Sequence, residues 1–72
     1  MTRTKIRLDT MSDVNKFVAT MGKIAEKIWL EDGDGNRVSA QSMLGVLYSL
    51  EWSHIYCYCE HDISYHLMPW AV

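Results

Sequence analysis

The sequence predicts an α+β fold, an open-faced sandwich in which two helices cover one face of a four-stranded antiparallel sheet. Several short segments alternate apolar and polar residues, which is typical of half-buried strands. Two other stretches repeat apolar residues at helical spacing. A glycine-rich turn joins two of the alternating segments as in a hairpin. The resulting order is strand, helix, strand, strand, helix, strand. This order favours an architecture in which the helices pack on one face of the sheet. Because the chain has 72 residues, we expect one domain over residues 1–72.

The first third of the chain is expected to form a strand and then a helix. Residues 4–8 alternate, and Ile6 and Leu8 lie on the inward face of the predicted strand. Thr10 or Ser12 can cap the helix that follows. This helix is expected to end near residue 24, because a glycine at position 22 weakens its last turn. Its apolar face consists of Val14, Phe17, Val18, Met21 and Ile24.

The middle of the chain predicts a β-hairpin. Residues 27–31 alternate, with Ile28 and Leu30 inward and Trp29 outward. The sequence Asp-Gly-Asp-Gly-Asn at residues 32–36 is typical of a hairpin turn. Residues 37–40 then form the short return strand.

The last third predicts a short helix, a strand and a tail. Ser42 caps the helix, and apolar residues follow it directly. Residues 54–60 alternate again, which places both cysteines inward and two tyrosines outward. In the tail at residues 61–72, one helical turn and an extended segment both fit the sequence, since Pro69 excludes a long helix. Met68, Trp70 and Val72 are apolar and are expected to cover part of the fold.

Composition excludes several classes of function. The formal net charge is −2, so we expect no nucleic-acid partner, because such binding requires basic residues. No apolar run approaches the roughly 20 residues of a membrane span, and the charged start lacks the apolar region of a secretory signal. We therefore expect a cytoplasmic protein that needs no membrane, with both cysteines reduced.

Metal, cofactor and nucleophile motifs are weak. From Asp32, the sixth and twelfth positions of a calcium loop hold Arg37 and Met43 instead of glycine and glutamate. Cys57 and Cys59 are separated by one residue, which favours core packing over a zinc site or an active nucleophile. We expect no metal and no cofactor. The outward aromatic residues of the sheet favour cross-strand pairing, with base stacking or a contact surface as alternatives.

Ser42 has two interpretations. Its hydroxyl can serve only as a helix N-cap. It can also be a phosphorylation site, because a phosphate there would face free backbone N–H groups and the positive end of the helix dipole.

The segment Ser39-Ala40-Gln41-Ser42-Met43-Leu44-Gly45-Val46 resembles the Ser-Ala-Lys-Ser-Ile-Met-Gly-Val segment of Gram-positive HPr proteins, the phosphocarriers of the bacterial sugar phosphotransferase system. Phe17-Val18 resembles the Phe-Val of that family's first helix, and the element order over residues 4–60 is also similar. The resemblance implies an HPr-like sandwich whose final long helix is reduced or missing. It also implies that Ser42 is the regulatory serine phosphorylated by HPr kinase, and that Met43, Leu44 and Leu47 belong to the partner-docking patch.

The family's phosphate-accepting histidine is replaced in this chain. The register set by Phe17-Val18 places Thr10 at the histidine, Ser12 at the family's arginine and Asp13 at its proline. Threonine does not form a labile phosphoimidazole, and Asp13 repels phosphate. In this respect the chain resembles Crh, a family relative that lacks the histidine, keeps the serine and acts in carbon catabolite regulation.

The leading hypothesis from the sequence is a non-catalytic, HPr-like interaction module that is regulated at Ser42. Its expected partner is a protein, either HPr kinase-like or a transcriptional or metabolic regulator. Two alternatives remain, a phosphocarrier that uses a non-standard residue and a structural protein that forms a homodimer.

Overall fold

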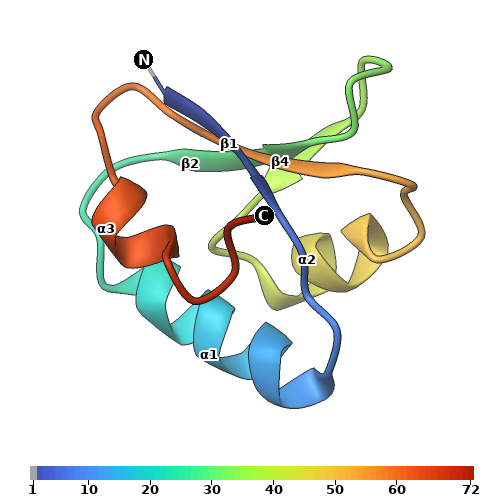
Figure 1. Cartoon of the computed structure of the whole chain (residues 1–72), viewed down its shortest axis with the longest axis horizontal. Helices are drawn as coiled ribbons and strands as arrows, with labels where there is room; N and C mark the ends of the chain where they lie inside the picture. Colours follow the sequence, from blue (N-terminus) through green and yellow to red (C-terminus); the bar gives the residue numbers. More distant parts are fainter. Residues whose placement is uncertain (1) are drawn as a thin grey trace.

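A computed structural model describes residues 2–72 and confirms the α+β open-faced sandwich. Strands β1 (Thr2–Ile6), β2 (Ile28–Glu31), β3 (Arg37–Ser39) and β4 (Ile55–Cys59) form one antiparallel sheet in the order β1-β4-β2-β3. Helices α1 (Met11–Gly22), α2 (Met43–Ser49) and α3 (Ser64–Leu67) all lie on one side of this sheet (Figure 1). Within residues 2–72, no helix lies on the other side of the sheet.

Strand β1 begins and ends two residues earlier than the alternation predicts. Leu8 is nevertheless buried, because the chain continues inward beyond the strand before it turns into α1. Helix α1 ends at Gly22, two residues before the predicted end, and Ile24 still packs against the core. The inward faces of both elements are therefore those that the pattern predicts.

The β2–β3 hairpin is confirmed. The Asp32 carboxylate accepts hydrogen bonds from the backbone N–H groups of Asp34 (2.7 Å) and Asn36 (3.1 Å). Gly33 and Gly35 have φ values of 87° and 101°, a region that residues with a Cβ rarely adopt. The turn thus depends on an Asx-type carboxylate and on two glycines.

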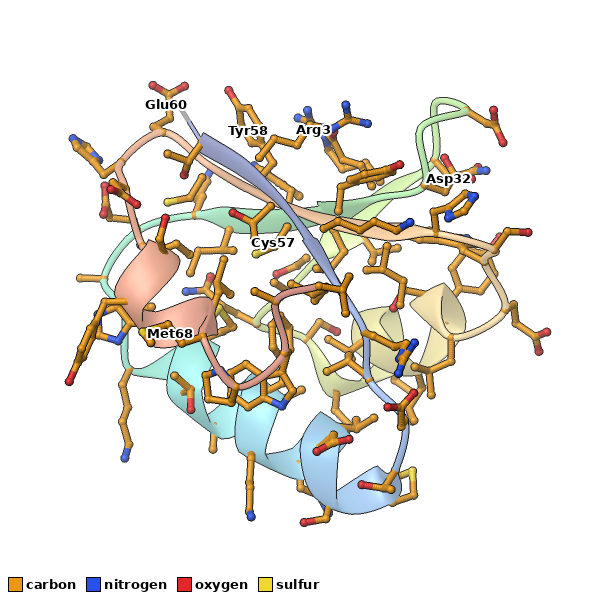
Figure 2. The ribbon with its side chains drawn as sticks, in the orientation of Figure 1. Arg3, Asp32, Cys57, Tyr58, Glu60 and Met68 are labelled. Carbon is orange, nitrogen blue, oxygen red and sulfur yellow. The ribbon has the colours of Figure 1, made fainter. Side chains whose placement is uncertain are left out.

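The core lies between the sheet and the helices. α1 contributes Val14, Phe17 and Met21, and the sheet contributes Ile28, Leu30 and Cys57, all of them almost fully buried. In Figure 2, Cys57 lies on the helix side of the sheet. The predicted inward faces of α1, β2 and β4 are therefore correct.

The tail at residues 61–72 forms one helical turn and then an extended segment, so both expected conformations occur. The extended part lies against β1, where the Arg7 N–H donates to the Trp70 carbonyl (2.9 Å) and the Val72 N–H to the Lys5 carbonyl (3.1 Å). Trp70 is buried, and its ring meets Phe17 edge-on at 5.2 Å. The expectation of burial is wrong for Met68 and Val72, because both side chains point to solvent. Helix α3, through Leu67, and Trp70 together close the helix side of the core.

Candidate functional site

Ser42 occupies the N-cap position of α2, as predicted. Its backbone is extended (φ −108°, ψ 123°), and its Oγ accepts a hydrogen bond from the Gly45 N–H at 3.2 Å. The side chain is half-buried. This geometry accounts for a serine as a cap, and it also leaves the hydroxyl at the positive end of the helix.

An apolar surface follows Ser42 directly along α2. Leu44 is 80% exposed, Tyr48 56%, Leu50 39% and Met43 38%; these four residues are called the α2 surface below. Leu47, which the family resemblance places in the docking patch, is instead half-buried and packs against the core. The sequence reasoning thus included one residue that belongs mainly to the core and missed Tyr48 and Leu50.

Two residues fix the position of α2. The Gln41 side-chain amide donates to the carbonyl oxygens of Met21 (2.9 Å), Ile24 (2.9 Å) and Glu26 (2.8 Å), where α1 ends. Gly45 allows α2 to approach β3 closely, since a Cβ there would lie 3.0 Å from the Ser39 carbonyl oxygen. The beginning of α2 is therefore held against both the end of α1 and the end of β3.

Thr10 is the N-cap of α1 and forms a complete capping box with Asp13. The Thr10 Oγ1 accepts from the Asp13 N–H (3.1 Å), while the Asp13 carboxylate accepts from the N–H groups of Thr10 (3.2 Å) and Asp9 (3.1 Å). Of the first amides of α1, which could hold an anion at the helix start, that of Asp13 is already bonded to the Thr10 hydroxyl. The Asp13 carboxylate, held on the amides just before the helix, would repel an incoming phosphate.

Thr10 and Ser42 lie at opposite ends of α1. Thr10 begins the helix, whereas Gln41, the neighbour of Ser42, contacts the carbonyl groups at its end. A helix of 12 residues is about 18 Å long at ~1.5 Å per residue. The two positions therefore do not form one site.

His54 lines a shallow groove of about 620 Å³ between β1 and the chain that leaves α2. Arg7 and Asp9 line the same groove, and Arg7 Nε contacts the Asp9 carboxylate at 3.2–3.3 Å. The groove thus brings an exposed histidine close to the segment that leads into Thr10.

The cysteines belong to the core. Cys57 and Cys59 are both free and buried. Burial, together with the neighbouring Cys59, raises the pKa of the Cys57 thiol to about 12. Over residues 2–72, no three His, Cys, Asp or Glu side chains gather in a way that could hold a metal ion. A thiol with so high a pKa is not a nucleophile near neutral pH.

The outer face of the sheet carries the aromatic residues that the alternation places there. Trp29 on β2 lies opposite Tyr58 on β4, and both are half-buried. Figure 2 shows Tyr58 and Arg3 pointing away from the helices. The guanidinium of Arg3 lies over the Tyr56 ring at 4.1 Å. Trp29 and Tyr58 are thus neighbours in the strand register, and the arginines of the edge strands lie against the rings of this face.

Comparisons with known proteins give no relative for this chain. No protein-family model matches it. No curated protein and no solved structure matches it either. Within residues 2–72, no helix is both long enough and apolar enough to cross a membrane.

Proposed function

We propose that this chain is a non-catalytic, HPr-like interaction module whose α2 surface docks other proteins and whose Ser42 is a regulatory phosphorylation site. The observation that carries the proposal is the α2 surface itself. Leu44 and Tyr48 stand largely exposed on a helix only seven residues long. Exposed apolar side chains that gather on one element of a small protein are typical of an interaction site.

The position of Ser42 supports a switch. A phosphate on its Oγ would add a charge of about −2 beside Met43 and Leu44. It would replace the hydroxyl that accepts from Gly45 with stronger acceptor oxygens, so the helix would keep its cap. Phosphorylation would therefore change the partners of the α2 surface without unfolding it, favouring a regulator with cationic side chains at its docking site.

The arrangement at Thr10 supports the non-catalytic part of the proposal. The capping box uses the Thr10 hydroxyl as an acceptor and places the Asp13 carboxylate on the N–H groups of Asp9 and Thr10, just before α1. The histidine position of the family thus performs a purely structural task in this chain. The proposed partners are an HPr kinase-like enzyme and a transcriptional or metabolic regulator.

Incubation with a bifunctional HPr kinase and ATP tests this function. We expect one phosphate on the parent protein, none on Ser42→Ala, and one on the control Ser12→Ala, which changes an exposed serine on α1. Phosphate on Ser42→Ala at the parent level would show that the site is wrong. For docking, Leu44→Asp should abolish capture by the kinase while the circular dichroism spectrum stays unchanged.

A second candidate function is a phosphocarrier that uses His54. The observation that favours it is that His54 lines the same groove as the Arg7–Asp9 pair. Incubation with enzyme I and phosphoenolpyruvate decides between the two functions. Acid-labile phosphate that disappears in His54→Asn would establish carriage, and unlabelled parent protein would exclude it.

A further inference from the structure

The uncovered face of the sheet combines aromatic rings with arginines. Trp29, Tyr56 and Tyr58 come from the two central strands, and Arg3 and Arg37 come from the two edge strands; these five residues are called the aromatic sheet face. The Arg37 guanidinium lies 5.5 Å from the centre of the Trp29 ring and 5.3 Å from that of Tyr58. Each edge strand thus supplies a flat cation to the rings beside it.

Glu31 holds these two arginines in place. Its carboxylate accepts a hydrogen bond from Arg37 Nε at 3.0 Å and lies 3.7 Å from Arg3 Nε. The Glu31 side chain is only 20% exposed. Because the carboxylate sits between the two guanidinium groups, both arginines are arranged before any ligand arrives.

The charge of this side is opposite to that of the whole chain. The outward positions of the strands carry three cationic side chains, Arg3, Lys5 and Arg37, and the Glu31 carboxylate, a formal charge of +2 against −2 for the chain. The residues that flank the strands add two cations and two carboxylates and leave this charge unchanged; they are Arg7, Lys27, Asp32 and Glu60. Alternation along the strands therefore makes the outer face of the sheet positive, although the chain as a whole is acidic.

A hollow of about 430 Å³ opens beside the aromatic sheet face. Trp29, Tyr58 and Arg37 line it on the strand side. The remaining lining residues are Glu26, Lys27, Glu60 and His61, and the Glu26 carboxylate is paired with the His61 imidazole. Aromatic rings and a guanidinium plane at one hollow provide stacking surfaces for a flat heterocycle.

We propose that the aromatic sheet face binds single-stranded nucleic acid. One base stacks in the hollow against Trp29 and Tyr58, and the phosphates follow β1 past Arg3 and Lys5, away from the Glu60 carboxylate. A duplex does not bind in this way, because its bases are already stacked on one another. The face lies on the side of the sheet opposite the α2 surface (Figure 1), so this activity is additional to the proposed function.

Fluorescence anisotropy with labelled single-stranded RNA and DNA of about 12 nucleotides tests the proposal. We expect binding near 50 mM salt whose log–log salt slope is about −2 to −3, since each of three or four cations contributes roughly −0.7. Trp29→Leu should weaken binding roughly tenfold through the lost stacking. A duplex of the same sequence should bind at least about tenfold more weakly.

Charge reversals supply the matched control. Lys5→Glu lies on the aromatic side, and Lys16→Glu lies on α1; both lysines are exposed, and both variants change the net charge equally. Lys5→Glu should weaken binding several-fold while Lys16→Glu leaves it within a factor of about two. Equal losses in the two variants, competition by polyglutamate as strong as by the oligonucleotide, or no binding at low salt would each overturn the proposal. So would a homodimer in sedimentation that Trp29→Leu dissociates, because the face would then belong to a second copy.

Discussion

Gly45→Ala is expected to destabilise the protein although it places a better helix former in α2. The added Cβ would lie 3.0 Å from the Ser39 carbonyl oxygen and 3.2 Å from the Val38 Cβ. Both neighbours belong to strand β3 and cannot rotate away. Overpacking of this kind costs about 1–3 kcal/mol, and the helix propensity of alanine recovers up to about 1 kcal/mol. Because two rigid contacts are involved, we expect the free energy of unfolding to fall by about 1–2 kcal/mol.

Gly22→Ala is the matched control, since nothing lies within 4 Å of a Cβ built at that position. It should stabilise the protein by about 0.5 kcal/mol through the lower entropy of the unfolded chain. Urea unfolding followed by circular dichroism measures both free energies of unfolding. For a domain of this size, the melting temperature of Gly45→Ala should fall by roughly 5–10 °C. A Gly45→Ala variant as stable as Gly22→Ala would refute the close packing of α2 on β3.

Three further predictions concern single side chains. Gln41→Ala should lower the free energy of unfolding by about 1–3 kcal/mol, because carbonyl oxygens at the end of α1 lose their donor. Gln41→Glu should lower it further. Equal stability of the two variants in urea would contradict the role of Gln41 as that donor. The Cys57 thiol, whose pKa is about 12, should resist iodoacetamide at pH 7 until denaturant is added, and rapid labelling of the native protein would show that it is accessible. The hydrogen bond from the Asn36 side chain lowers the pKa of Asp32 below 3.8, so Asp32 stabilises the turn above that pH and loses this effect as the pH falls through the lower folded-state pKa. Carbon-13 NMR should show the Asp32 midpoint rising toward 3.8 in Asn36→Ala, and an unchanged midpoint would argue against this cause.

Most of the fold was predicted because helix caps and turns depend on residues that are close together in the sequence. The Thr10 and Ser42 caps follow from the affinity of a hydroxyl for free amides at a helix start. The hairpin follows from glycines that adopt positive φ. Strand ends were less accurate, since β1 ends where its pairing with β4 ends, at Ile6 opposite Ile55. Pairing partners are distant in the sequence, and alternation alone does not reveal them.

Contacts between distant segments explain what the sequence did not predict. Gln41 reaches the end of α1 across as many as 20 positions of the chain, and a polar residue before a helix carries no sign of such a partner. The tail posed the same difficulty: Trp70 is buried through its contact with Phe17, whereas Met68, two residues earlier, is exposed. For the candidate site, Ser42 and the exposed residues beside it were predicted. Leu47 was assigned to the surface because a family pattern does not report how far α2 tilts into the core.

The net charge of the whole chain differs from the charge of the outer sheet face, and the reason is geometric. In an antiparallel strand with one buried face, every charged residue must occupy the other face, so charges on short strands gather on one side. Arg3 and Lys5 on β1 and Arg37 on β3 are placed together in this way. Most of the acidic residues lie in loops and helices. A net charge of −2 therefore does not describe the field that a ligand meets at the sheet.

Strands β2 and β3 lie between the two proposed surfaces, and this makes their activities separable. The backbone of Ser39 packs against Gly45 of α2, while Arg37 on the same strand faces outward. Pairing of Ser39 with Trp29 and of Arg37 with Glu31 fixes that backbone, so a small change on α2 should not reach the outer side chains. Leu44→Asp should therefore leave oligonucleotide affinity unchanged, and Lys5→Glu should leave phosphorylation of Ser42 unchanged. If either variant impaired both activities with the fold intact, the two surfaces would be coupled through β2 or β3.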